Sequence, residues 1–418
     1  MTAVARLDRW IRTEFVEHNT ELEEAYFAER REIVHRRPEL EKVKQALVAE
    51  GSHLIRAVSA AGPLPPASRE KYQLLGMVGF YLAACRRHEV TALSEDTASF
   101  EDAASGSSAP AHGAGPPGNT ASFEPVWSLA QRLGSALGVA PRFVFAHQAL
   151  YNPAVRDRYQ TFTALPDETV FLTSNGLAVL AYQRAADALR RIPPMGVSNP
   201  LTTYLLETAL SALEDVLRFT QDLGRALDVD RFFFNIRPYF KSHRVGPVEY
   251  RGANAGDFSA INELDLLLGL GDTRDPFYQN VIAEKYAYLA PEDQALLRAV
   301  VDEESLLARF LREPEPGPRL RRNAELFLAV CRAHGAASTY HHHRLVKPFL
   351  VVPAEQAPAE RLSGITASGP PLDVVVAALS RLSDLRSARD RPGVPTARAA
   401  LERLRSLISD PSPAVSPR

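Results

Sequence analysis

The sequence has only two cysteines, Cys85 and Cys331, among 418 residues. A disulfide framework, a zinc site built from thiolates and an iron–sulfur cluster are therefore excluded. The chain also lacks a long uninterrupted apolar run, and its first residues do not form a signal-peptide pattern. We therefore expect a cytoplasmic protein that does not cross a membrane.

An excess of charge of one sign is missing too. The sequence carries 48 Lys and Arg against 50 Asp and Glu, which gives a net charge of -2. Such a balance provides no electrostatic footprint for nucleic acid or for an anionic membrane. We expect a small-molecule partner instead, and the composition does not distinguish a monomer from a homodimer. The chain lacks the motifs G-x-x-x-x-G-K, H-E-x-x-H and G-x-S-x-G, which removes the usual support for nucleotide-binding and hydrolase functions.

What the sequence does contain is a helical period along most of its length. Apolar residues recur at intervals of three and four, whereas strand-like alternation is scarce and is best at residues 245–250. We predict an all-α fold, with a small helical domain at 1–160 and a larger helical domain at 161–410. Residues 94–122, rich in Ser, Ala, Gly and Pro, are predicted to form a flexible insert, and residues 411–418 a disordered tail. Helices are predicted at 4–50, 74–87, 126–137, 170–191, 201–227, 260–270, 276–289, 291–310 and 319–350.

In contrast to its two cysteines, the sequence has eleven histidines. Three of the histidines, His341, His342 and His343, are consecutive. Consecutive residues of an α-helix point about 100° apart, so at most one of the three faces inward. Apolar residues follow His342 at three, four and seven positions, and small residues precede it. A histidine on such a face suits a proximal ligand of a flat cofactor such as haem. The alternative is a satisfied or exposed histidine run, and the spacing alone favours that alternative.

A second candidate is the segment 232–239, in which Arg237 follows Phe232-Phe233-Phe234-Asn235-Ile236. An arginine in so apolar a run is costly to bury unless an anion meets it. Its planar fork suits a carboxylate, which suggests a substrate carboxylate. An internal Asp or Glu and a haem propionate are the alternative partners.

A third candidate is the small-residue stretch at 250–257, which contains Gly252, Ala255 and Gly256. Such a loop lets the backbone approach a ligand closely. The alternative is a plain turn with a helix cap supplied by Asn254 or Asp257, and these residues alone favour it.

The order of these segments resembles the haem-dependent indoleamine 2,3-dioxygenase superfamily, in particular the branch that contains monodechloroaminopyrrolnitrin synthase. The resemblance spans roughly residues 151–385. The family pattern H-L-Q-I-V followed by I-P-A corresponds to residues 342–346 and 352–354, and it singles out His342. The patterns G-x-x-A-G-x-x-S and D-x-L-L-G correspond to 252–259 and 265–269. F-F-x-x-x-R corresponds to 232–237, and F-L-x-S ends at Ser174.

This resemblance implies a haem b enzyme that uses O2 or peroxide as co-substrate. It implies that His342 binds the iron, with Gly252 and Arg344 near the cofactor. Catalytic roles fall on Ser174 and on Arg237, which would bind the substrate carboxylate. The substrate would also be contacted by Phe145, Phe232, Ala255 and Gly256.

The predicted function is a haem b-dependent oxygenase of an aromatic amino acid, of tryptophan or indole type, in specialised metabolism. A non-catalytic haem-binding sensor or carrier of the same fold is one alternative. A protein of this fold without a cofactor is another, with the histidine run on its surface.

The sequence departs from the family at three places. Thr339 stands where the family has an arginine that pairs with a haem propionate, so Arg344, Arg251 or His341 would have to take that role. Phe145 occupies the place of the dioxygenase's distal tyrosine. The glycine- and threonine-rich loop that closes the family's active site corresponds only loosely to residues 363–369.

Overall fold

The computed structural model describes residues 1–28, 37–90, 123–313, 317–356, 366, 370–392 and 394–409. It is 73% helical, and its described residues form one two-stranded sheet, which confirms the predicted all-α fold. The predicted insert at 94–122 and the predicted tail at 411–418 lie outside the described residues, as does the loop at 363–369 apart from Thr366. The division of the chain at residue 160 stays a prediction.

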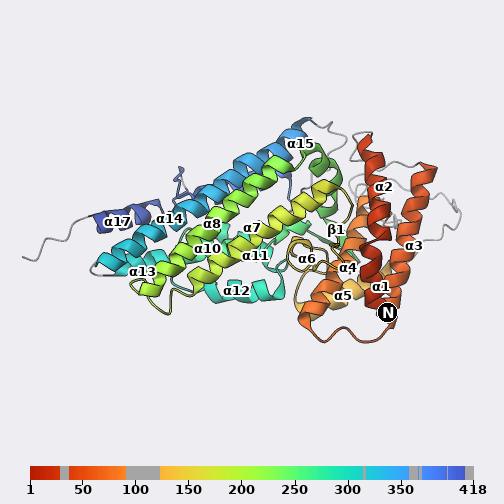
Figure 1. The fold of residues 1–418 in the computed structure, drawn as a ribbon, viewed down its shortest axis with the longest axis horizontal. Coiled ribbons are helices and arrows are strands. Elements are labelled where there is room, and N and C mark those ends of the chain that lie inside the picture. The colour runs from red at the N-terminus through yellow and green to blue at the C-terminus, as the bar shows by residue number, and fades with distance from the viewer. Residues whose placement is uncertain are drawn as a thin grey trace, which may run out of the picture.

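Helices α1 to α6 gather at the end of the molecule that contains the N-terminus (Figure 1). The continuous helix predicted at 4–50 is wrong, because the chain turns at residues 12–13 and a new helix starts at Pro38, a residue that fits the first helical turn. Helix α4 is buried over most of its length, as its apolar sequence predicts. The helices of this end are α1 (Ala3–Ile11), α2 (Glu14–Ala28), α3 (Pro38–Ala60), α4 (Ser68–Arg87), α5 (Glu124–Leu137) and α6 (Phe145–Ala149).

Three long helices lie side by side in the rest of the molecule (Figure 1). They are α7 (Pro166–Arg190), α8 (Pro200–Ala226) and α14 (Pro318–Tyr340), and α8 packs against both of the others. Each of the three begins with a proline, which has no N–H to leave unsatisfied. Shorter helices cover them: α10 (Ala260–Leu268), α11 (Pro276–Tyr286), α12 (Pro291–Val301), α13 (Leu306–Arg312), α16 (Leu372–Arg386) and α17 (Arg398–Ser409).

The segment between α8 and α10 changes conformation repeatedly. It contains α9 (Val229–Arg231), the π-helix η3 (Phe232–Ile236), the 3-10 helix η4 (Arg237–Phe240), the strands β1 (His243–Val245) and β2 (Val248–Tyr250), and the 3-10 helix η5 (Ala253–Ala255). The strands pair antiparallel, with Val245 opposite Val248. The strand predicted at 245–250 is therefore the second half of a hairpin whose turn includes Gly246 at φ 62°.

Helix α14 leads directly into a second π-helix, η6 (His341–Val351), followed by α15 (Val352–Gln356). The backbone N–H of Val352 donates to the carbonyl of Lys347, five residues earlier. Pro348 lies inside η6, and a proline has no N–H and clashes with the carbonyl of the preceding α-turn. The wider turn accommodates it. The helix predicted at 319–350 is continuous, but its period changes at the first of the three histidines.

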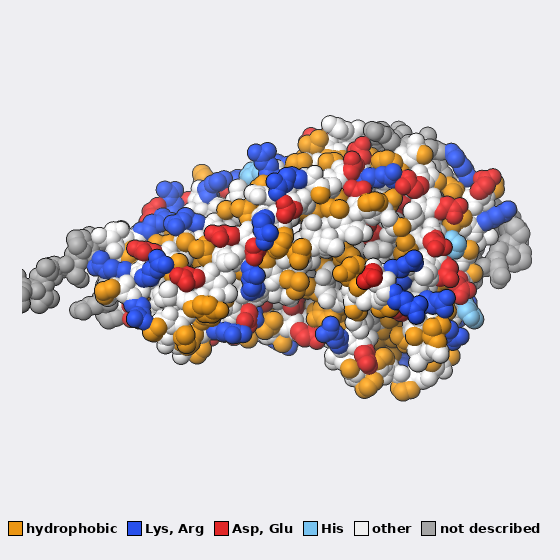
Figure 2. All heavy atoms as spheres, viewed as in Figure 1, with side chains coloured by type: hydrophobic (Ala, Val, Ile, Leu, Met, Phe, Trp, Pro, Cys, Tyr) orange, Lys and Arg blue, Asp and Glu red, His pale blue; other side chains and the backbone are white. Residues whose placement is uncertain are grey.

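Two large hydrophobic clusters make up most of the core. One joins α1–α6 to residues of the 223–255 segment and to Phe349 of η6, and the other joins α7, α8, α10, α13, α14 and α17. Cys85 lies in the first and Cys331 in the second, and burial raises the pKa of each thiol to about 12. On the face drawn in Figure 2, side chains of both charges alternate with apolar ones. Among the described helices, none is long and apolar enough to cross a membrane.

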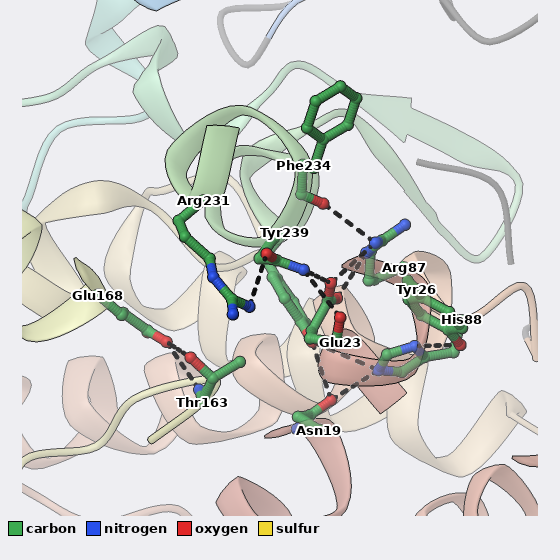
Figure 3. A network of polar contacts seen from close by, with 11 residues as sticks. Asn19, Glu23, Tyr26, Arg87, His88, Thr163, Glu168, Arg231, Phe234 and Tyr239 are labelled. Carbon is green, nitrogen blue, oxygen red and sulfur yellow. Dashed lines mark hydrogen bonds and ion pairs between the residues drawn. The ribbon is translucent and has the colours of Figure 1, made fainter. Parts of the chain in front are cut away.

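A buried ion pair ties the π-helix η3 to the N-terminal helices (Figure 3). Nε of Arg87 on α4 lies 2.7 Å from Oε1 of Glu23 on α2, and these side chains are 2% and 0% exposed. Glu23 also accepts a hydrogen bond from Nδ2 of Asn235 at 2.9 Å, and Arg87 donates to the carbonyl of Phe234 at 3.2 Å. Two elements of the N-terminal end therefore fix the position of η3.

Neutral groups extend this network. Asn19 accepts hydrogen bonds from Nε2 of His88 at 2.7 Å and from the hydroxyl of Tyr239 at 3.2 Å. The hydroxyl of Tyr26 lies 3.1 Å from Nδ1 of His88. Burial lowers the pKa of His88 well below its ordinary value, so the ring is neutral, with Nε2 as donor and Nδ1 as acceptor.

We expect Glu23→Gln to lower the free energy of unfolding by about 3–5 kcal/mol, because it leaves the charge of Arg87 buried without its carboxylate. Denaturant unfolding followed by circular dichroism measures the change. Glu24→Gln is the matched control, since the neighbouring Glu24 is 48% exposed and pairs with Arg231 at the surface; its effect should stay below about 1 kcal/mol. Equal effects of the two substitutions would contradict the structural role of the buried pair.

Candidate functional site

The three consecutive histidines begin η6 and face different surroundings. Solvent reaches the side chain of His341, but the protein packed around it and the charge of Arg386 lower its pKa to about 4. His342 is buried, and His343 is exposed and lines a groove on another face of the helix. Among the described residues, no three His, Cys, Asp or Glu side chains converge as a side-chain metal site would require. The arrangement agrees with the expectation that adjacent histidines do not share one ion.

His342 is 4% exposed, and its apolar neighbours Leu345, Val346 and Phe349 are buried with it. Its ring lies edge-on to that of His343, with 4.8 Å between the centroids. Nδ1 is buried and finds no hydrogen-bond partner among the described residues. Burial, together with the neighbouring His343 and Lys347, lowers the pKa of His342. The ring is therefore neutral at pH 7, and a neutral imidazole is the form that binds a metal.

Two of the predicted substrate-contacting residues, Phe145 and Phe232, belong to one row of aromatic rings. Phe171 of α7 lies between them, with its centroid 5.9 Å from that of Phe145 and 5.1 Å from that of Phe232. Phe232 in turn contacts Phe349 of η6 at 6.0 Å. The row therefore joins α6, α7 and η3 to the helix that carries His342. Spacing predicted that Phe349 shares the face of His342, but it did not predict the contribution of Phe171.

Ser174 lies on α7, one turn beyond Phe171. Aromatic contacts join α7 to the helix formed by α14 and η6 both before and after Ser174 in the chain. On one side the aromatic row reaches η6 from Phe171. On the other, the ring of Tyr182 on α7 meets that of His334 on α14 at 6.1 Å. Ser174 is half-buried, and its hydroxyl forms no hydrogen bond within the described part of the chain. Such a hydroxyl is free to bind a ligand, as the family pattern implies.

The predicted ligand loop contains Gly252, Ala255 and Gly256, and all three are buried. A Cβ at Gly256 would lie 2.6 Å from the backbone of Tyr288, so the glycine is explained by this protein contact. Neither cap proposed from the sequence forms, because α10 begins after Ser259 without a side-chain cap. Instead, Asp257 adopts φ 53°, in the left-handed region that side chains disfavour.

Arg237 opens η4 and is 7% exposed. Its guanidinium carbon lies 4.1 Å from the centroid of the Phe233 ring. Burial, together with the like charges of Arg87 and Arg86, lowers the pKa of Arg237 to about 10. An anion brought to this guanidinium would offset both effects. The buried carboxylate of Glu23, an internal acid of this region, pairs with Arg87.

At the position of the family's propionate-pairing arginine, the hydroxyl of Thr339 lies 3.3 Å from that of Ser383 on α16. Of the replacements considered from the sequence, Arg251 pairs with Glu284 at 2.7 Å, and Arg344 is exposed in the same groove as His343. A contact of Arg344 with a haem propionate stays a prediction.

The buried arginine close to α14 is Arg386 of α16, which the sequence did not indicate. It holds both carboxylate oxygens of Asp265, with its Nε 2.9 Å from Oδ1 and its Nη2 2.8 Å from Oδ2. Asp265 also accepts from Nε2 of His334 at 2.7 Å and from the hydroxyl of Tyr278 at 2.9 Å. Burial alone would raise the pKa of Asp265, but the charge of Arg386 and the hydrogen bonds outweigh it and lower the pKa well below 3.8.

The residues around His342 fit a haem group. Haem iron takes an axial imidazole, and His342 offers a buried, neutral ring whose Nδ1 has no partner in the described chain. A flat apolar macrocycle needs apolar walls, which the row from Phe145 to Phe349 can provide. His342 is the residue that would hold the iron.

A sequence profile of the protein family described as "Monodechloroaminopyrrolnitrin synthase PrnB" matches residues 1–408. The match therefore includes both ends of the fold, the N-terminal helices as well as the long helices that carry the candidate site.

We expect Asp265→Asn to lower the free energy of unfolding at pH 7 by about 3–5 kcal/mol, because it leaves Arg386 buried without its carboxylate. The folded-state pKa of Asp265 lies below its ordinary 3.8. Its contribution is therefore complete above about pH 5 and is lost as the pH falls through the folded-state pKa. The difference between wild type and variant should narrow on acidification.

Urea unfolding at a series of pH values measures this narrowing. Asp272→Asn is the control, because that carboxylate is half-exposed and pairs with the exposed Arg274. We expect little change from it. A gap between wild type and Asp265→Asn that stays constant with pH would show that the carboxylate charge is not what stabilises the fold.

Proposed function

The chain belongs to the monodechloroaminopyrrolnitrin synthase family of haem-dependent oxidoreductases, and we propose that it is a haem b-dependent oxygenase of an aromatic amino acid. The proposed substrate is tryptophan or an indole-bearing derivative of it, and the proposed setting is secondary metabolism. The family match over residues 1–408 is the observation that carries this proposal. Membership in a family of enzymes argues against the alternative that the protein is a non-catalytic sensor or carrier.

His342 is the proposed iron ligand. Three observations support it: its position in the family's histidine pattern, its burial, and the lack of a hydrogen-bond partner at Nδ1 among the described residues. Bound haem would supply the redox centre that activates the co-substrate, O2 or peroxide. His341, whose side chain solvent reaches, is the rival ligand.

Arg237 is proposed to bind the substrate carboxylate. A buried guanidinium with other arginines nearby favours an anion, and its fork can donate two parallel hydrogen bonds to a carboxylate. This contact would fix the orientation of the substrate's ring, which is catalysis by proximity. Arg237 would thus contribute binding and orientation, without a proton transfer of its own.

Phe145 and Phe232 are proposed to pack against the substrate's aromatic ring and to exclude water from it. Both already lie in an aromatic row, where edge-to-face contacts with a further ring are favourable. Ser174 is proposed to hydrogen-bond the co-substrate or the substrate through its unpartnered hydroxyl. Ala255 and Gly256 are proposed to complete the wall, and their lack of bulk leaves room for an indole.

We expect His342→Ala to abolish the haem Soret band, because it removes the proposed axial ligand. The protein is supplied with haem, and its absorbance spectrum is recorded before and after removal of unbound haem. His341→Ala and His343→Ala are the matched controls on either side and should keep the band. Loss of the band in His341→Ala, with a normal band in His342→Ala, would identify His341 as the ligand.

We expect Arg237→Ala to weaken binding of an aromatic amino acid by about 1.5–3 kcal/mol, since it removes a charge-assisted contact to the carboxylate. Titration of tryptophan and its ring-substituted forms against the ferric protein, followed by the Soret shift, measures this loss. Arg231→Ala is the control, because Arg231 pairs with Glu24 and lies over Phe27 instead. Unchanged affinity in Arg237→Ala would remove its proposed role.

A further inference from the structure

We propose that a groove on the α8 and α17 side of α14 binds a small aromatic carboxylate, at a site separate from the one around His342. The groove has a volume of about 530 Å³, within the range of roughly 300–1,000 Å³ that small-molecule sites occupy. It lies between α8, α14, the first turn of η6, the end of α16 and α17. Its histidine is His343, whereas neither His341 nor His342 lines it.

The apolar part of the groove is formed by small residues between two leucines. Gly335 and Ala336 lie along α14, where a Cβ at Gly335 would come within 2.7 Å of the carbonyl of Arg386. Leu217 of α8 and Leu401 of α17 form the sides. Small residues between two leucines leave a flat apolar slot, which suits a ring better than a branched aliphatic chain.

The charged side chains that line the groove are all arginines. Arg332, Arg344 and Arg405 line it together with Arg386, and no Asp or Glu does. Arg386 is already neutralised by Asp265. The guanidinium groups of the other three form no ion pair or hydrogen bond with any residue that the structure describes.

The groove provides no carboxylate of its own to pair with these three arginines. Two exposed acids on the surrounding helices are paired with other arginines, Asp222 with Arg225 and Glu402 with Arg398. Three cations around one apolar slot repel one another, and an anion among them relieves that repulsion. A carboxylate is the anion whose two oxygens match the planar fork of an arginine. The flat apolar slot and the arginines around it together indicate a ligand that has an aromatic ring and a carboxylate.

Isothermal titration of the haem-loaded protein tests the proposal, with indole-3-propionate as the anionic probe and indole-3-propionamide as its neutral match. We expect the Arg332→Gln, Arg405→Gln double variant to bind the acid about tenfold or more weakly, since each arginine contributes a charge-assisted contact. Its Soret band should be unchanged, because the groove does not include His342. Arg403→Gln is the control, because Arg403 is exposed on the same helix and does not line the groove.

Ala336→Trp provides a second test that keeps every charge. Ala336 is exposed in the groove, so an indole there should fill the slot and abolish the part of acid binding that depends on Arg332 and Arg405, without unfolding the protein, as circular dichroism can verify. Binding of acid and amide with equal affinity, or equal affinity of wild type and the double variant, would overturn the proposal. So would a gain in affinity on removing residues 410–418, which would make the chain itself the occupant.

Discussion

One carboxylate, that of Asp265, holds together the helices around the candidate site. It lies on α10 and binds Arg386 of α16, His334 of α14 and Tyr278 of α11. A buried charge is tolerated only when its oxygens are fully occupied, and here each oxygen has more than one donor. Because His334 precedes His341 by two turns on the same face, the ion pair also sets the orientation in which α14 enters the histidine run.

Both segments that carry candidate chemistry leave the α-helical period. Phe232 and Asn235 belong to η3, with Arg237 next to it, and the three histidines begin η6. The two π-helices meet through Phe232 and Phe349. π-turns are rare and concentrate at functional sites, since the extra residue in the turn redirects side chains that an α-turn would stack. The Glu23–Arg87 pair holds η3 in this conformation from the side of the N-terminal helices.

Most helices could be predicted from the sequence because their apolar period is local information. The resemblance proposed His342 and Arg237, and the structure buries both. Spacing placed His342 on an apolar face, but it could not show that the histidine run belongs to a π-helix, because periodicity arguments assume an α-helix. Pro348 was the visible signal of the π-helix. Arg386 had no signal, since its partner Asp265 lies more than a hundred residues earlier. The close approach of Tyr288 to Gly256 had no signal either, because Tyr288 comes from another element.

The two cysteines have a consequence beyond excluding metal clusters. Only a thiolate reacts readily with peroxide or forms a disulfide, and burial raises the pKa of Cys85 and Cys331 to about 12. At pH 7 roughly one molecule in 100,000 then carries the reactive form at either position. A chain that works beside a redox cofactor thus keeps its two oxidisable sulfhydryls almost inert.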